Sequence, residues 1–311
     1  MTGPFRAAPD RAILECMDTT RTSPTTSQAA LLPDGLRLGA VHLSVSDLDR
    51  SAAFYERSLG LVTRGREGDE ARLGTGVQDL VVLHERPGAR PALRSAGLFH
   101  FALLHPSRLE LARAVVRLAV TRTPVDGASD HGVSEAIYLP DPDGNGIELY
   151  ADRPREAWPA PGAGERVGMF TRALDIPDLL AAAGDEEPRA RSSDGLVMGH
   201  MHLHVGDVEQ AVAFYRDLVG FEWMTGMPSA AFLSAGGYHH HLAVNTWRGR
   251  GIAPAPLDAL GLRRWTILLP QADDVAGARG RLDTAGVETE DADGGFLLRD
   301  PWGIAALVTT G

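Results

Sequence analysis

Three residues of metal-binding types occupy equivalent positions in apolar segments: His42, His100 and Glu148. The segments that hold them, residues 41–45, 99–103 and 146–150, alternate apolar residues with others, as half-buried strands do. Alternate side chains of a strand face opposite sides of its sheet. Because the apolar side must face a covering helix, we expect both imidazoles and the carboxylate to share the concave side.

Two histidines and one carboxylate on one side of a metal leave up to three neighbouring coordination positions for other ligands. This donor set suits Fe(II) and also Mn(II), whereas no thiolate is present to favour a structural zinc site. The sequence therefore predicts a divalent metal bound by His42, His100 and Glu148. Fe(II) is the preferred ion and Mn(II) the alternative.

An internal repeat determines which elements must hold these residues. The segment that starts at Gly39 recurs from Gly199 at an offset of 160 residues, so that His42 corresponds to His202. Each copy reads as a strand, a helix that begins after an Asp N-cap and ends at a Gly, and three further strands. A fainter match relates the segment from Asp141 to that from Asp300.

Four such units predict an α+β fold, in which four βαβββ modules pair into two half-open barrel domains. We expect helices at 107–120 and 273–286 in the second and fourth units. Consecutive units are expected to pair. The predicted organisation is a mobile arm (1–34), a metal-binding domain (35–152), a linker (153–197) and a second domain (198–311).

These residues also carry a family resemblance. The repeated module, the starting-strand histidines and the segment GNGIELY resemble the vicinal oxygen chelate superfamily, which includes glyoxalases, bleomycin-resistance proteins and extradiol dioxygenases. The stretches GLFHFALLHPSRLELA and SAGGYHHHLAVNTW are most similar to bacterial catechol-2,3-dioxygenase-like proteins. The resemblance covers roughly residues 36–310. It implies the same fold and a metal site, but it gives little information about the substrate, because one fold hosts several chemistries.

The resemblance also implies roles for His131 and Tyr138, which precede Glu148 in the same unit. His131 would act as an acid/base or hydrogen-bond dioxygen, and Tyr138 would hydrogen-bond a substrate oxygen. One feature departs from the family, because two-domain extradiol enzymes keep their iron in the C-terminal domain. In the C-terminal copy of this chain, Trp265 and Leu307 are expected in the places of His100 and Glu148.

The second half of the chain contains many histidines of unassigned purpose. Strand parity puts His200, His202 and His204 on one side, and likewise His239 and His241. No carboxylate accompanies them by the same parity. A polar pocket or a hydrogen-bond network is therefore the preferred interpretation over a second metal.

Composition limits the partners. The net charge of −11 argues against nucleic acid, and no apolar run is long enough to suggest a membrane span. The single cysteine, Cys16, excludes an intramolecular disulfide and fits a cytoplasmic protein. The sequence does not decide whether the protein forms a homo-oligomer.

The preferred function is extradiol ring cleavage of a small aromatic diol, a catechol-like substrate, with O₂. Two alternatives share the fold: a glyoxalase-like metal-dependent isomerase or lyase, and a non-catalytic small-molecule-binding resistance protein. The isomerase needs a further metal ligand, which the sequence does not offer. The binding protein needs no metal at all.

Overall fold

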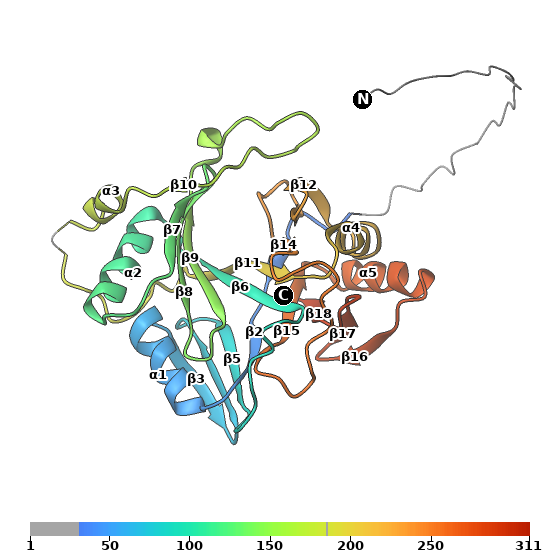
Figure 1. Ribbon diagram of the computed structural model, residues 1–311, viewed down its shortest axis with the longest axis horizontal. Coiled ribbons are helices and arrows are strands. Elements are labelled where there is room, and N and C mark those ends of the chain that lie inside the picture. The colour runs from blue at the N-terminus through green and yellow to red at the C-terminus, as the bar shows by residue number, and fades with distance from the viewer. Residues whose placement is uncertain (1–30, 185) are drawn as a thin grey trace, which may run out of the picture.

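A computed structural model describes residues 31–184 and 186–311 and contains the four predicted modules (Figure 1). The first consists of β2 (Val41–Val45), α1 (Leu48–Leu59), β3 (Val62–Glu67), β4 (Glu70–Gly74) and β5 (Asp79–Glu85). The second consists of β6 (Gly97–Leu104), α2 (Arg108–Val120), β7 (Gly127–Asp130), β8 (Ser134–Pro140) and β9 (Gly146–Asp152). The predicted α+β class with four modules is confirmed.

The second half of the chain repeats this order. The third module consists of β11 (Val197–His204), α4 (Val208–Val212), the π-helical continuation η2 (Ala213–Val219), β12 (Glu222–Met227), β13 (Ala230–Ser234) and β14 (Leu242–Asn245). The fourth consists of β15 (Gly261–Leu269), α5 (Ala272–Thr284), β16 (Thr289–Ala292), β17 (Gly295–Arg299) and β18 (Ala305–Thr310). A short strand, β1 (Arg37–Leu38), precedes the first module and pairs with β15.

Local sequence explains where α1 begins and ends. The side chain of Asp47 accepts a hydrogen bond from the backbone N–H of Arg50, which caps the N-terminus. Gly60 ends the helix with a φ of 70°, in the left-handed region that glycine adopts without strain. One face of the helix carries an apolar stripe that is buried, Leu48, Ala52, Tyr55 and Leu59. In the third module, Asp207 caps α4 in the same way.

The strand pairing differs from the predicted one. One nine-stranded sheet joins the first and fourth modules through antiparallel β2 and β15, and the other joins the second and third through antiparallel β6 and β11. The expectation that consecutive modules share a domain, as 35–152 and 198–311, is therefore wrong. All four starting strands have similar apolar patterns, so the pattern fits either pairing equally well.

Consecutive modules are instead joined on the helical side. The hydroxyl of Tyr55 in the first module donates to Asp141 of the second over 3.0 Å, and Tyr215 in the third donates to Asp300 of the fourth over 3.1 Å. Helices α1 and α2 also pack together, as do η2 and α5 (Figure 1). The two halves of the chain are thus related by an approximate twofold axis, with each sheet formed from both halves.

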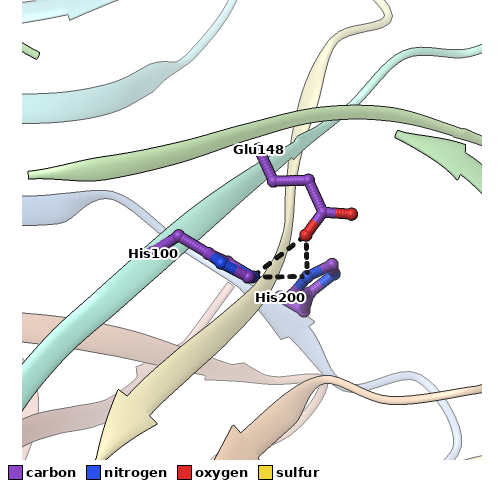
Figure 2. A group of neighbouring side chains, drawn as sticks. All are labelled: His100, Glu148 and His200. Carbon is purple, nitrogen blue, oxygen red and sulfur yellow. Dashed lines mark hydrogen bonds and ion pairs between the residues drawn. The ribbon is translucent and has the colours of Figure 1, made fainter. Parts of the chain in front are cut away.

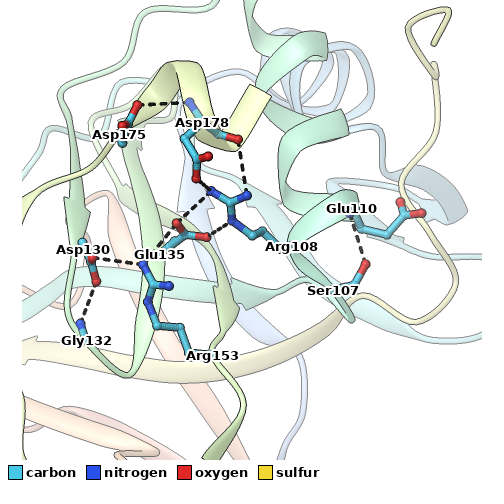
Figure 3. A network of polar contacts seen from close by, with 9 residues as sticks. All are labelled: Ser107, Arg108, Glu110, Asp130, Gly132, Glu135, Arg153, Asp175 and Asp178. Atoms are coloured by element: carbon cyan, nitrogen blue, oxygen red, sulfur yellow. Dashed lines mark hydrogen bonds and ion pairs between the residues drawn. The ribbon is translucent and has the colours of Figure 1, made fainter. Parts of the chain in front are cut away.

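The connection between the halves, 153–196, folds onto the second module. It contains η1 (Arg155–Ala157), β10 (Arg172–Ala173), which extends the sheet beside β7, and α3 (Ile176–Ala181). Figure 3 shows the ion pairs that attach α3: Arg108 of α2 contacts Glu135 of β8 and Asp178 of α3, each over 2.6 Å. These ion pairs hold the predicted linker against the second module.

The start of the described chain is also attached. Leu32 is buried, and its backbone N–H donates to the carbonyl of Gly220 over 2.8 Å, so residues 31–34 are not part of a free arm. The predicted arm up to residue 30, with Cys16, lies outside the described residues. Among the helices of residues 31–184 and 186–311, none combines the length and apolar character that a membrane crossing requires.

Candidate metal centre

Three buried side chains from the second and third modules converge: His100 of β6, Glu148 of β9 and His200 of β11 (Figure 2). Oε2 of Glu148 lies 3.0 Å from Nε2 of His100 and 3.1 Å from Nε2 of His200. The two Nε2 atoms are 3.4 Å apart. Two nitrogen donors and one acidic oxygen donor therefore surround a single point.

The register of the sheet brings these residues together. Ala102 of β6 lies opposite Glu148 on one side and opposite His200 on the other, and His100 lies two residues earlier on the same face. The methyl group of Ala102 leaves room for the larger side chains beside it. A register shift follows in β6 and β11, where Phe99 turns toward the same cavity as His100 rather than toward the helices.

The electrostatics leave Glu148 and His200 in the state that a metal requires. Burial alone would raise the pKa of Glu148, but the His200 and His100 imidazoles outweigh burial and hold this pKa well below its usual range. Burial lowers the pKa of His200 to about 4. At neutral pH the centre therefore offers a carboxylate and a neutral imidazole at His200.

The geometry fits a divalent ion. Ligand atoms that lie about 2.1 Å from a metal, at right angles to one another, are about 3 Å apart. The three observed separations fall close to that value. Because the set holds two imidazoles and one carboxylate, it also matches the donor types that Fe(II) and Mn(II) accept.

His42 does not join this group. It lies on β2 in the other sheet, where its Nδ1 is 3.0 Å from Nε2 of His84 and its Nε2 is 3.4 Å from the guanidinium of Arg264. Burial, followed by the charge of Arg264, lowers the pKa of His42 to about 3. The predicted grouping of His42 with His100 and Glu148 is wrong, because β2 pairs with β15 and not with β6.

The structure also revises the comparison between the two sheets. Arg264, not Trp265, lies opposite His42, as His100 lies opposite His202 in the other sheet. Trp265 is buried on the opposite face, near Tyr215. The first sheet thus has the guanidinium of Arg264 at the position where the other sheet has the candidate ligand His100.

His131 and Tyr138 lie together at the wall of the candidate centre. Nδ1 of His131 donates to the carbonyl oxygen of Phe170 over 3.1 Å, because a carbonyl can only accept. Nε2 of His131 lies 2.7 Å from the Tyr138 hydroxyl and can accept a hydrogen bond from it. Burial, with the nearby Glu148 carboxylate, raises the pKa of Tyr138 well above its usual value, so the phenol stays protonated.

A second chain of hydrogen bonds ends at His240. The Asp152 carboxylate accepts from Nε2 of His239 over 2.9 Å, and Nδ1 of His239 lies 2.7 Å from Nδ1 of His240. Burial lowers the pKa of His240, and the His200 and His239 imidazoles lower it further, so this imidazole is a neutral base beside the centre.

A third network fixes His202. Oδ1 of Asn245 accepts from the backbone N–H of Trp247 and from Nδ1 of His204, which determines the orientation of the amide. Its Nδ2 then donates to Nε2 of His202 over 2.8 Å. The proton of His202 is thus confined to Nδ1. The preferred interpretation, a hydrogen-bond network, fits His202 and His204, whereas His200 of the same set lies in the candidate metal group.

A cavity of about 420 Å³ opens beside the three converging groups. Its polar side chains include Tyr138, His131, His202 and His240. The apolar part of the wall comes from both modules and from the connection, and includes Phe99, Val133, Met169, Phe170, Phe232 and Trp247. This cavity is large enough for a small aromatic molecule.

The sequence did contain a signal for His200. Its strand parity is the same as that of His202 and His204, so that a cavity-facing position follows from the pattern. The missing information was the carboxylate, which Glu148 supplies from a different module across the β6–β11 pair.

Comparisons with known proteins agree with this architecture. Residues 37–149 and 197–306 match the profile of the Glyoxalase/Bleomycin resistance protein/Dioxygenase superfamily. A protein of Bacillus subtilis (strain 168) named catechol-2,3-dioxygenase is 42% identical over 270 residues, covering 85% of this chain and 93% of that protein.

Two solved structures show the same fold. A putative dioxygenase from Bacillus subtilis subsp. subtilis str. 168 aligns with a TM-score of 0.60 at 13% identity, over 88% of this chain and 85% of that one. Glyoxalase I from Zea mays aligns with a TM-score of 0.55 at 16% identity, over 89% of this chain and 92% of that one. At these identities the likeness concerns the fold alone.

Proposed function

Since this chain belongs to the Glyoxalase/Bleomycin resistance protein/Dioxygenase superfamily, we propose that it is an extradiol-type dioxygenase that cleaves a catechol-like ring with O₂. The observation that carries this proposal is the convergence of His100, Glu148 and His200 beside a mostly apolar cavity. The catechol-2,3-dioxygenase of Bacillus subtilis, a relative at 42% identity, supports the choice of reaction.

His100, Glu148 and His200 would hold one divalent ion, with Fe(II) preferred and Mn(II) as the alternative. When bound, the ion would act as a Lewis acid and template that lowers the pKa of adjacent hydroxyls and brings the diol and dioxygen together. The protein supplies the shape of the site. Phe99, Phe232 and Trp247 provide apolar surface for a flat ring and exclude water from it.

Two imidazoles could move the protons of the diol. The neutral His240 imidazole could accept one proton, and the chain through His239 to Asp152 would stabilise the positive charge that this proton brings. The hydroxyl oxygen of Tyr138 could accept a proton from a substrate hydroxyl while its own proton passes to Nε2 of His131, so that the pair acts as one relay.

The number of candidate metal ligands favours a dioxygenase over a glyoxalase-like isomerase. Within the described ranges, the group that could hold a metal contains three residues and no second carboxylate. A binding protein without a metal would not need to bury a carboxylate between two imidazoles, because burying such a charge without a partner is costly.

The test is anaerobic loading with Fe(II), followed by measurement of bound iron and of oxygen uptake with a panel of catechols. Wild type should bind one iron and form a yellow ring-fission product. Glu148→Ala and His200→Ala should each lower iron affinity at least about 100-fold, because each removes one of three ligands. His42→Ala also removes one imidazole, but from the other sheet, and this variant should keep both bound iron and activity.

Two results would contradict separate parts of the proposal. Retention of iron by His200→Ala with loss from His42→Ala would show that the ligand set is wrong. Normal iron binding by wild type without oxygen uptake on any catechol would reject the dioxygenase while leaving the metal centre intact.

A further inference from the structure

A second hollow lies where the two halves of the chain meet. It encloses about 410 Å³ and is lined by the loops that join consecutive modules, residues 86–96 and 246–260. These loops contact each other through bridges of Pro91 with Leu260 and of Ser95 with Ala253. The equivalent turns at 143–145 and 302–304 complete the wall, so corresponding segments of both halves build the hollow.

Four arginines line this hollow: Arg86, Arg248, Arg263 and Arg299. None of them forms an ion pair with a carboxylate in the part of the chain that the structure describes. Arg248 and Arg299 donate only to neutral backbone carbonyls, those of Ser95 and Gly303. The guanidinium groups therefore keep most of their donors available.

The acidic side chain at the wall does not neutralise them. Asp143 accepts hydrogen bonds from Arg50 and from the hydroxyl and backbone N–H of Ser46. Carboxylates are in excess in this protein, because the chain has 41 acidic and only 30 basic residues. The wall of this hollow therefore carries an excess of positive charge, although the chain as a whole has a net charge of −11.

The cations in the hollow are destabilised by their surroundings. Burial lowers the pKa of Arg263, and the neighbouring positive charge of Arg86 lowers it further, while the more weakly acting Asp69 and Glu70 carboxylates do not outweigh burial. Burial also lowers the pKa of Arg248. An anion between them would relieve both effects, and planar guanidinium groups bind carboxylates and phosphates through paired hydrogen bonds.

Apolar side chains stand beside the arginines. Leu93 is 75% exposed and Leu257 is 90% exposed, and both line the hollow together with Trp302. Large apolar side chains at the edge of a concave site favour a ligand with an apolar part of its own.

We propose that this hollow binds a small organic anion with at least two negative charges next to an apolar group. The charged head is a carboxylate or phosphate, held by Arg86, Arg248 and Arg263, and the apolar group contacts Leu257. The site is separate from the metal centre and does not depend on the function proposed for it.

Calorimetric titration with four probes tests the proposal. Phenyl phosphate and phenylsuccinate carry both features, whereas inorganic phosphate and succinate carry only the charge. One of the two phenyl compounds should bind at least about tenfold more tightly than its parent anion, and the tighter one identifies the head group. Affinity should fall as salt is added.

Matched double variants locate the binding. Arg86→Gln/Arg263→Gln should weaken binding about tenfold or more, because charge-assisted hydrogen bonds are lost. Arg90→Gln/Arg94→Gln changes the same charge on exposed residues of the same loop that do not line the hollow, and should change affinity less than about twofold. Circular dichroism verifies that both variants are folded.

Three outcomes would overturn the proposal. The first is that none of the probes binds. The second is that both double variants weaken binding equally, which indicates general charge attraction. The third is that the Arg86/Arg263 variant binds as wild type does, which places the ligand elsewhere.

Discussion

At the residue scale, the size and position of neighbouring side chains on β6, β9 and β11 determine the geometry of the candidate centre. Ala102 separates Glu148 from His200 in the sheet, while His100 stands two residues away on the same face. Around them, hydrogen bonds orient two further imidazoles, because His131 donates to the Phe170 carbonyl and His240 pairs with His239, which donates to Asp152. The protein thus holds these imidazoles in place beside the ligands before any substrate binds.

Tyr138→Phe tests the proposed relay. The variant removes the hydroxyl that donates to His131 and leaves all three candidate ligands in place. We expect kcat with catechol to fall about 10²-fold or more, within the usual range for acid–base groups, while bound iron stays unchanged. An unaltered kcat in steady-state oxygen uptake would contradict a role for the relay.

Asp300 makes stability depend on pH. Burial raises its pKa to about 6, although Tyr215 and two backbone N–H groups donate to the carboxylate. Because the folded pKa lies above the unfolded value of 3.8, its contribution to stability is complete below that value and is lost as pH rises through 6. The loss corresponds to about 3 kcal/mol at about 1.4 kcal/mol per unit.

Urea unfolding of wild type and Asp300→Asn between pH 4 and 7 measures this effect. The asparagine keeps an oxygen for the two backbone donors and does not ionise. The difference in free energy of unfolding should therefore shift in favour of Asp300→Asn by about 2 to 3 kcal/mol as pH rises. Asp283→Asn, at an exposed position, should show no comparable shift. A parallel pH dependence of wild type and Asp300→Asn would refute the assignment.

At the scale of elements, the β6–β11 pair carries the centre, because these two strands supply both histidines. Gly199 adjoins His200, and a Cβ at this position would collide with the hydroxyl and ring of buried Tyr150. The ion pairs of Arg108 hold the connection that brings Met169 and Phe170 to the cavity.

Gly199→Ala should lower the free energy of unfolding by about 1 to 3 kcal/mol, the usual cost of overpacking a core. Because the strand must shift, iron affinity should fall as well. Gly127→Ala is a matched control, since no atom lies within 4 Å of the added methyl group in β7. Chemical denaturation and iron titration measure both effects. Equal stability of the two variants would show that β11 is not closely packed there.

At the scale of the whole molecule, each sheet needs both halves of the chain. The Tyr55–Asp141 and Tyr215–Asp300 bonds join the modules within a half, whereas strand pairing joins one half to the other. A half by itself would leave β6 or β11 without its partner, and would contain at most two of the three candidate ligands.

A chain divided between Glu187 and Pro188 tests this arrangement. Both residues are exposed, so the break itself should cost little. Fragment 31–187 by itself should not bind iron at the affinity of the whole chain, and co-expression with 188–311 should restore binding. Size-exclusion chromatography and iron analysis report the result. Full iron binding by the first fragment by itself would favour the tandem pairing of modules instead.

Local sequence patterns were sufficient to predict much of the structure of this protein. The 160-residue repeat, the Asp caps, the apolar helix stripes and the alternation that turns His100 and Glu148 inward depend on neighbouring residues only. They could therefore be predicted from the sequence. So could the adjacency of His131, Tyr138 and Glu148, which lie in one module.

The choice of partner strands was decided by tertiary structure. Val41–Val45 and Val197–His204 have the same alternation, so either could pair with β6 by pattern alone. Packing of α1 on α2, and the fit of whole modules around the approximate twofold axis, selects β11. That selection replaces His42 with His200 as the third candidate ligand, because strand pairing depends on surfaces that no single segment contains.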